Sequence, residues 1–263
     1  MISENLISNL LRTLPEGRIV DICIGLHWTA VVLEVKGEYR CGLASTLAGE
    51  HDHTGQADIP RAGYLTASPA SELAAFLLEA HPTRRSLGLA TINALLPVPQ
   101  SWTEENAEET ILRLGRRKRV ALIGHFPFVP RLREQLDHLD VLDQTPKAGD
   151  LPPEAAPDVL PRADVIAITS MTLHNGTLEH LLQLCRPQSQ VMLLGPSTPL
   201  SPLLFRYRVD FLAGSLVEDI DAVMSAVAQG GNFRQVHRAG VRLVTLKASR
   251  MGAEFAPHGS ASA

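Results

Sequence analysis

The second half of the chain alternates short apolar runs with stretches of helical periodicity, and this alternation constrains the fold more than any other feature. The runs are rich in Val, Ile, Leu and Ala and lie at 119–124, 141–143, 164–169, 190–195, 210–214 and 242–246. Helical patterns at about 128–137, 176–185 and 218–228 separate several of them. Apolar strands that alternate with helices are typical of a parallel sheet covered on both faces. The second half is therefore predicted to be a doubly wound α/β domain.

The first half shows a different pattern. Runs rich in β-branched residues lie at 18–25 and 29–35, and a third strand-like run follows at 39–44 after a tight turn. This spacing predicts an antiparallel meander. Helical patterns lie at 2–14, from Ser68 to His81, and at about 84–96. A small antiparallel sheet accompanied by helices is an α+β arrangement.

The segment Pro97-Val98-Pro99 is the strongest boundary signal. Ser101 and Glu104 form a capping-box pattern, which predicts a helix from there to about Leu114. We therefore expect an α+β domain at 1–98 and a doubly wound domain at 99–248. The remaining 249–263 is rich in Gly, Ala and Ser and is expected to be a flexible tail.

Composition excludes several classes of protein. A net charge of -4 with 5% aromatic residues argues against nucleic-acid binding. No apolar run approaches the roughly 20 residues of a membrane span, and Met1 to Leu14 lacks a signal-peptide pattern. Cys23, Cys41 and Cys185 form no CxxC pair, which fits a reducing compartment. We expect a soluble, cytoplasmic protein without nucleic-acid or membrane partners, and a homodimer stays open.

Small and polar residues follow several of the predicted parallel strands. They are Gly124 to Pro127, Ser170 with His174 to Thr177, Gly195 to Thr198, and Gly214-Ser215. Ligands of an open parallel sheet bind outside the carboxyl ends of its strands, and helix N-termini there suit an anion. The alternative is structural: 175–177 as a turn and cap, 195–198 as a plain loop, and Ser215 as a capping-box residue with Glu218.

Histidines are the candidate metal ligands. His125 follows a predicted strand, where an imidazole can bind a metal or transfer a proton. His51 and His53 form a dense group with Glu50 and Asp52 in a long polar loop. The two histidines, with Glu50 or Asp52 as a further ligand, could bind zinc or a similar metal. The alternatives are a packed loop histidine for His125 and a solvated loop for the His51–His53 group.

Several common sites are excluded by their missing motifs. Gly124 stands alone before bulky residues and a proline, so no G-x-G-x-x-G fingerprint for a standard NAD site is present. The sequence also contains no P-loop and no G-x-S-x-G elbow. The basic run Arg116 to Arg119 precedes the first parallel strand and is interpreted as a solvated helix end.

A set of short motifs, in this order and spacing, resembles a prokaryotic family described as a heavy-metal chelation domain. The motifs are Gly25 to Val31, Cys41 to Ala44, Leu87 to Ala94, Gly124 to Pro127, Asn175 to Leu178 and Gly195 to Pro199. The resemblance covers about residues 5 to 247. It implies an N-terminal domain like the small domain of enolase, a Rossmann-like C-terminal domain, and a site in the cleft between them. The site residues it implies are Thr29, Asn93, His125, Asn175, Thr177 and Ser197.

These observations lead to three hypotheses. The first is a protein that binds a metal ion or a small metal–chelate in the cleft, with His125, His51 and His53 as metal ligands. Asn175 and Thr177 would orient the ligands, and the further binding residues would be Thr29, Asn93, Gly195 and Ser197. The second is an enzyme for a small anionic metabolite, held at helix N-termini with His125 transferring a proton. The third is a non-catalytic partner-binding protein that uses the loop at 45–67. The sequence favours the first.

Overall fold

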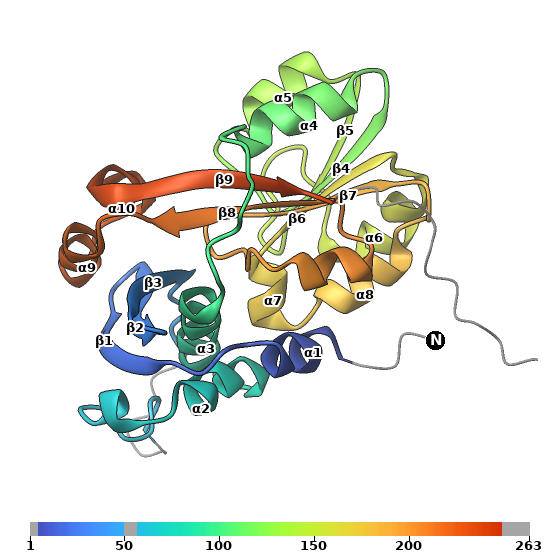
Figure 1. Cartoon of the computed structure of the whole chain (residues 1–263). Helices are drawn as coiled ribbons and strands as arrows, with labels where there is room; N and C mark the ends of the chain where they lie inside the picture. The colour runs from blue at the N-terminus through green and yellow to red at the C-terminus, as the bar shows by residue number, and fades with distance from the viewer. Residues whose placement is uncertain (1–4, 50–56, 249–263) are drawn as a thin grey trace, which may run out of the picture.

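The computed structural model describes residues 5–49 and 57–248 and contains two β-sheets (Figure 1). The smaller sheet is antiparallel, in the order β1-β2-β3, and is formed by β1 (Arg18–Ile24), β2 (Trp28–Val35) and β3 (Glu38–Ser45). Its accompanying helices are α1 (Leu6–Arg12), α2 (Ala70–Ala75) and α3 (Pro82–Leu95). α3 packs closely on the sheet because Gly42 has no side chain; a Cβ there would lie 2.2 Å from Ala90 O.

The larger sheet has six strands in the order β5-β4-β6-β7-β8-β9. Its strands are β4 (Arg119–Ile123), β5 (His138–Leu142), β6 (Val165–Thr169), β7 (Gln190–Leu194), β8 (Phe211–Val217) and β9 (Val241–Lys247). All neighbours pair in parallel except β8 and β9, which are antiparallel. After β5, the chain returns past β4 and forms β6 on the other side of β4. The order in which strands are added to the sheet therefore reverses between β4 and β6. The predicted fold class, α+β followed by a doubly wound sheet, is confirmed.

Helices cover both faces of the larger sheet, as the strand composition predicts (Figure 1). α4 (Ala107–Gly115) and α5 (Val129–Gln135) cover one face; α6 (Ala156–Val159), α7 (Met171–Asn175) and α8 (Leu178–Leu184) lie on the other. Successive side chains of a strand point to opposite faces of the sheet. Val120 and Leu122 pack with α4 and α5, whereas Ala121 packs on the opposite side. Both sides of each central strand are thus buried.

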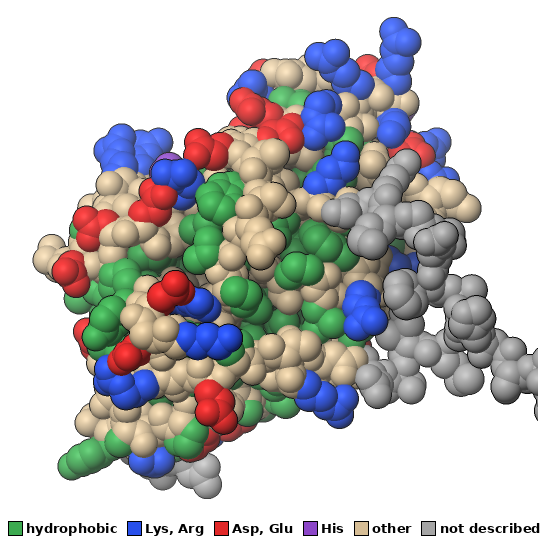
Figure 2. All heavy atoms as spheres, viewed as in Figure 1, with side chains coloured by type: hydrophobic (Ala, Val, Ile, Leu, Met, Phe, Trp, Pro, Cys, Tyr) green, Lys and Arg blue, Asp and Glu red, His purple; other side chains and the backbone are tan. Residues whose placement is uncertain are grey.

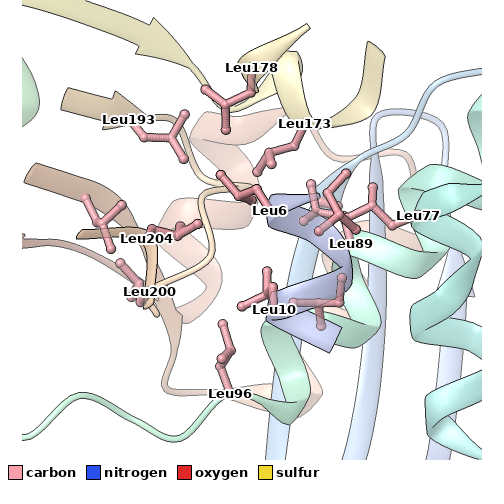
Figure 3. Close-up of a cluster of buried hydrophobic side chains, with 14 of the residues drawn as sticks. Leu6, Leu10, Leu77, Leu89, Leu96, Leu173, Leu178, Leu193, Leu200 and Leu204 are labelled. Atoms are coloured by element: carbon pink, nitrogen blue, oxygen red, sulfur yellow. The ribbon is translucent and has the colours of Figure 1, made fainter. Parts of the chain in front are cut away.

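The N-terminal part (residues 5–96) and the C-terminal part (residues 107–248) share one continuous core. In Figure 3, Leu6 of α1 lies close to Leu173 of the C-terminal part. Leu10, Leu178 and Leu204 belong to the same buried cluster. On its other side, the small sheet contacts α9 (Ile220–Ala228), which with α10 (Phe233–Gly240) connects β8 to β9. The small sheet is therefore held between α3 and the helices of the C-terminal part.

A linker, residues 96–106, joins α3 to α4 and crosses the middle of the face that Figures 1 and 2 both show. Hydrophobic side chains gather around the middle of this face, and charged side chains lie mostly over its outer parts. The exposed residues Val98 and Trp102 belong to the linker. Among the described helices, none combines the length and apolar character needed to cross a membrane.

Two predicted helix starts are wrong. The helix expected from Ser101 begins at Ala107, because Asn106 accepts a hydrogen bond from Glu108 N while Thr103 pairs with Thr245 beside β9. Ser215 caps no helix: it lies within β8, and Asp219 caps α9 by accepting from Ala222 N. The short helices α6, α7 and α10 had no counterpart in the sequence-based assignment. The predicted tail at 249–263 lies outside the described residues.

Candidate functional site

A cavity of about 850 Å³ lies at the carboxyl ends of β4, β5 and β6, where the strand order reverses. We call it the switch-point cavity. Such a reversal is where doubly wound sheets bind ligands, because the loops diverge and leave a crevice. Apolar atoms make up most of the surface of its lining, and the apolar residues there are Leu47, Ile123, Phe126, Leu142, Pro153, Ala156, Pro157, Met171 and Leu181. The polar lining includes His125, Asp143, Gln144, Glu154, Thr169, Thr172, Asn175, Thr177 and His180.

The loop after β4 is held in place by backbone and carboxylate contacts. Gly124 has φ +103, a conformation that favours glycine, and its N–H donates to Leu142 O at 2.8 Å. His125 N donates to Asp143 Oδ2 at 2.7 Å. Thr145 N donates to the other oxygen of Asp143 at 2.8 Å. Asp143 therefore joins the loops that follow the two neighbouring strands and fixes the backbone of His125.

The side chain of His125 is oriented by a buried carboxylate. Its Nδ1 lies 2.7 Å from Oδ2 of Asp150, whose side chain is fully buried. Arg133 Nη2 donates to Oδ1 of Asp150 at 2.7 Å, and Lys147 N donates to Oδ2 at 2.9 Å. A carboxylate acceptor favours the tautomer with the proton on Nδ1, which leaves the lone pair of His125 on Nε2.

The charge of Asp150 is maintained by these contacts. Burial alone would raise the pKa of Asp150. The hydrogen bonds from Lys147 N and His125, together with the charge of Arg133, outweigh burial and hold the pKa below its ordinary value. Asp150 is therefore an ionised acceptor at neutral pH.

Asn175 and Thr177 lie on the same cavity as His125. Gly176, with φ +75, ends α7 between them. Thr177 donates to Asn175 Oδ1 through both Oγ1, at 2.7 Å, and its backbone N, at 3.1 Å. Residues 175–177 therefore form a turn, as the structural interpretation expected, and Asn175 and Thr177 also line the cavity.

Asn93 and Ser197 lie instead at the junction between the two parts, and Thr29 lies within the N-terminal part. Asn93 Nδ2 donates to Leu43 O at 2.8 Å and to Ser197 O at 3.1 Å. Ser197 Oγ accepts from the backbone N of Ser45 at 2.9 Å. Thr29 is fully buried and its Oγ1 shares a 2.9 Å hydrogen bond with Thr46. Asn93 and Ser197 thus connect β3 to the loop after β7, whereas Thr29 connects β2 to the segment after β3. None of the three lines the switch-point cavity.

The other predicted residues have different positions. Gly195 lines a second cavity, described below. His51 and His53 lie outside the described residues. Within residues 5–49 and 57–248, no three His, Cys, Asp or Glu side chains are grouped closely enough to hold a metal ion.

Three residues of functional interest were missed from the sequence. Asp150 lies 25 residues after His125 in an irregular loop, and no motif connects them. Glu154 and His180 line the cavity from the connections before and after β6. His180 is three residues beyond Thr177 on α8, and this helical spacing is a signal that could have identified it.

His174 is buried at the junction rather than in the cavity. Its side chain is 2% exposed, and desolvation, with the positive charge of Arg85, lowers its pKa to about 4. Arg85 donates to Leu173 O at 2.9 Å, so it attaches α3 to α7. His174 is therefore an uncharged core residue at neutral pH.

The fold and cavity define a doubly wound α/β protein with a cavity at its switch point, joined to a small α+β part. Two family models match, both described as "Putative heavy-metal chelation": DUF364 over residues 106–245 and DUF4213 over residues 7–96. The chain belongs to the DUF364 family, and the resemblance drawn from the motifs is confirmed.

Similar proteins cover most of the chain. The uncharacterized protein MJ0500 of Methanocaldococcus jannaschii is 25% identical over 85% of this chain and 90% of its own length. A crystal structure of a DUF364 protein of unknown function from Desulfitobacterium hafniense has a TM-score of 0.80 and 26% identity, covering 92% of this chain and 97% of that one. A second DUF364 structure, from Pyrococcus horikoshii, has a TM-score of 0.78 and 22% identity, covering 94% of this chain and 100% of that one; it supports the fold alone.

Proposed function

We propose that this protein binds a metal ion carried in a small organic complex in the switch-point cavity, with Nε2 of His125 as a ligand from the protein. The observation that carries the proposal is the orientation of His125 by Asp150. A metal-binding histidine commonly donates its other ring N–H to a carboxylate, which fixes the tautomer and raises the basicity of the ligating nitrogen. His125, Asp150 and Arg133 form this arrangement beside a cavity, with distances of 2.7 Å at both links.

The shape of the cavity favours a complex over a bare ion. About 850 Å³ is within the range of small-ligand sites, roughly 300–1,000 Å³. A hydrated ion would gain nothing from the apolar wall formed by residues such as Leu142, Met171 and Leu181. An organic chelator would bury its carbon atoms against that wall and leave one coordination position for the imidazole. Asn175 and Thr177, which line the cavity, would orient its polar groups.

The family description supports the metal component of the proposal. The descriptions of both matching models concern heavy-metal chelation. An imidazole nitrogen suits zinc, copper, iron and nickel ions. When bound, the metal would supply the coordination bond that discriminates the loaded chelator from the empty one, while the side chains of the cavity would recognise its organic part.

Calorimetric titration with copper(II) iminodiacetate tests this function, because that complex keeps open positions for an imidazole. The wild-type chain should bind one equivalent at a tight site, and His125→Ala should lose it. His138→Ala is the matched control, since His138 is exposed at the opposite end of the sheet, in β5. Asp150→Asn should weaken binding by about 10- to 100-fold, the usual effect of removing a carboxylate behind a ligating histidine. Equal binding by wild type and His125→Ala would contradict the proposal.

A further inference from the structure

A second cavity, of about 670 Å³, lies at the carboxyl end of β7 and beside the middle of β8. We call it the aromatic cavity. Residues 194–196 at the end of β7 and Ala213 and Gly214 of β8 line it, as do residues 243–245 of β9. Phe126 lines both this cavity and the switch-point cavity, so the two adjoin at the loop after β4.

Aromatic side chains are concentrated in this cavity. The chain has only two Trp, three Tyr and seven Phe residues, and four of these rings, Trp28, Phe126, Phe128 and Phe233, line the aromatic cavity. Phe126 and Phe128 stack at 9° with centroids 5.1 Å apart. Trp28 and Phe233 are tilted by 47° with centroids 5.2 Å apart. Trp28 is buried while the three Phe rings remain partly exposed, so ring surface is available to a ligand.

Part of the wall is kept free of side chains. A Cβ on Gly195, whose φ is +125, would lie 2.7 Å from Ser170 Oγ. A Cβ on Gly214 would lie 2.8 Å from Thr198 O. Packing on the far side therefore requires glycine at both positions, and backbone forms this part of the wall. A flat molecule can approach such a surface closely.

The charged residues of the cavity are already paired. Glu105 accepts from Arg113 Nε and Nη2 at 2.9 and 3.0 Å. Glu108 lies 3.1 Å from Arg131. These pairs neutralise the charge beside the cavity, so it offers no unbalanced charge to attract an ion.

We infer that the aromatic cavity binds an uncharged, planar aromatic small molecule, stacked between the phenylalanine rings and the backbone wall. Aromatic rings prefer offset or edge-to-face contacts with other rings, and such contacts add about 0.5–1.5 kcal/mol to simple burial. The volume suits a ligand of two or three fused rings. This site is independent of the metal proposed for the neighbouring cavity.

Fluorescence titration with acridone, an uncharged planar tricyclic probe, tests this inference. The experiment uses the full chain with Trp102→Phe, so that Trp28 is the remaining tryptophan. Acridone should quench Trp28 by energy transfer and saturate at one equivalent. The bulky alcohol 1-adamantanol should compete weakly, because it offers apolar surface without a flat face.

Two variants locate the binding. Phe128→Leu removes a ring from the cavity and should weaken acridone binding roughly two- to tenfold. Phe76→Leu is the matched control: it makes the same change at a buried ring in the N-terminal part and should leave binding unchanged. Equal affinities for wild type and Phe128→Leu, absence of saturable quenching, or equally tight binding of adamantanol would overturn the inference. Trp28 emission that depends on protein concentration without probe would assign the cavity to a second copy of the chain and would also overturn it.

Discussion

Replacing Asp150 with asparagine keeps the volume of a buried side chain and removes its charge. Oδ2 of Asp150 accepts hydrogen bonds from both His125 Nδ1 and Lys147 N, while Oδ1 accepts one from Arg133. In asparagine one of these oxygens becomes an NH₂ group. If it occupies the Oδ2 position it faces the N–H of Lys147, and if it occupies the Oδ1 position it faces Arg133. Either orientation places two donors against each other.

The expected cost follows from that conflict. A buried donor left without an acceptor costs about 1–3 kcal/mol, and the partial exposure of Arg133 places the expectation in the lower half of that range. Urea denaturation at pH 7 measures it. Asp164→Asn is the control, because Asp164 also pairs with an arginine but its side chain is 38% exposed; its loss should not exceed about 1 kcal/mol.

The dependence on pH gives a second test of the same residue. The folded-state pKa of Asp150 lies below its ordinary value, so the ionised side chain contributes stability above the unfolded pKa, and this contribution is lost as pH falls through the folded pKa. The difference in stability between wild type and Asp150→Asn should therefore shrink in acid. A difference that is absent at pH 7, or that stays constant down to the lowest pH at which both proteins fold, would refute the reasoning.

Two further predictions concern the core. Leu204 is fully buried in the cluster shared by both parts, so Leu204→Ala should lower the unfolding free energy by about 2–5 kcal/mol in urea; a loss below 1 kcal/mol would show that the shared core is loosely packed. His174 has a folded pKa of about 4 against an ordinary value of 6.5, so the unfolded chain binds more protons between these values and stability should rise with pH across that window. The uncharged variant His174→Gln should show a flatter pH profile there, and an unchanged profile would contradict the assigned burial.

The fold was predictable because its signals are local and repeated. Apolar runs such as 164–169 and 190–195 became β6 and β7, since a strand buried on both faces must be apolar throughout. The helix starts at Ser101 and Ser215 failed because capping patterns are short and strand pairing is stronger: Ser215 pairs with Leu243 in β9. Such pairing connects residues far apart in sequence and leaves no local pattern.

The candidate site was predictable only in part, for a similar reason. His125 and Asn175 follow neighbouring parallel strands, β4 and β6, so their meeting on one cavity follows from the strand order. Ser197 also follows a parallel strand, β7, but its backbone carbonyl accepts a hydrogen bond across the junction from Asn93, a residue of α3 that only the family resemblance implied. This contact depends on how the N-terminal and C-terminal parts pack against each other, which no local sequence pattern records. Asp150 lies in an irregular loop, and only the folded structure brings it to His125.

The central claim is that Nε2 of His125 coordinates a metal held in a small complex. Pulsed electron paramagnetic resonance of copper(II) iminodiacetate, added at less than one equivalent, detects the remote nitrogen of a coordinated imidazole. We expect this coupling in the wild type and in His138→Ala, and its loss in His125→Ala. The same coupling in His125→Ala as in the wild type would contradict the account.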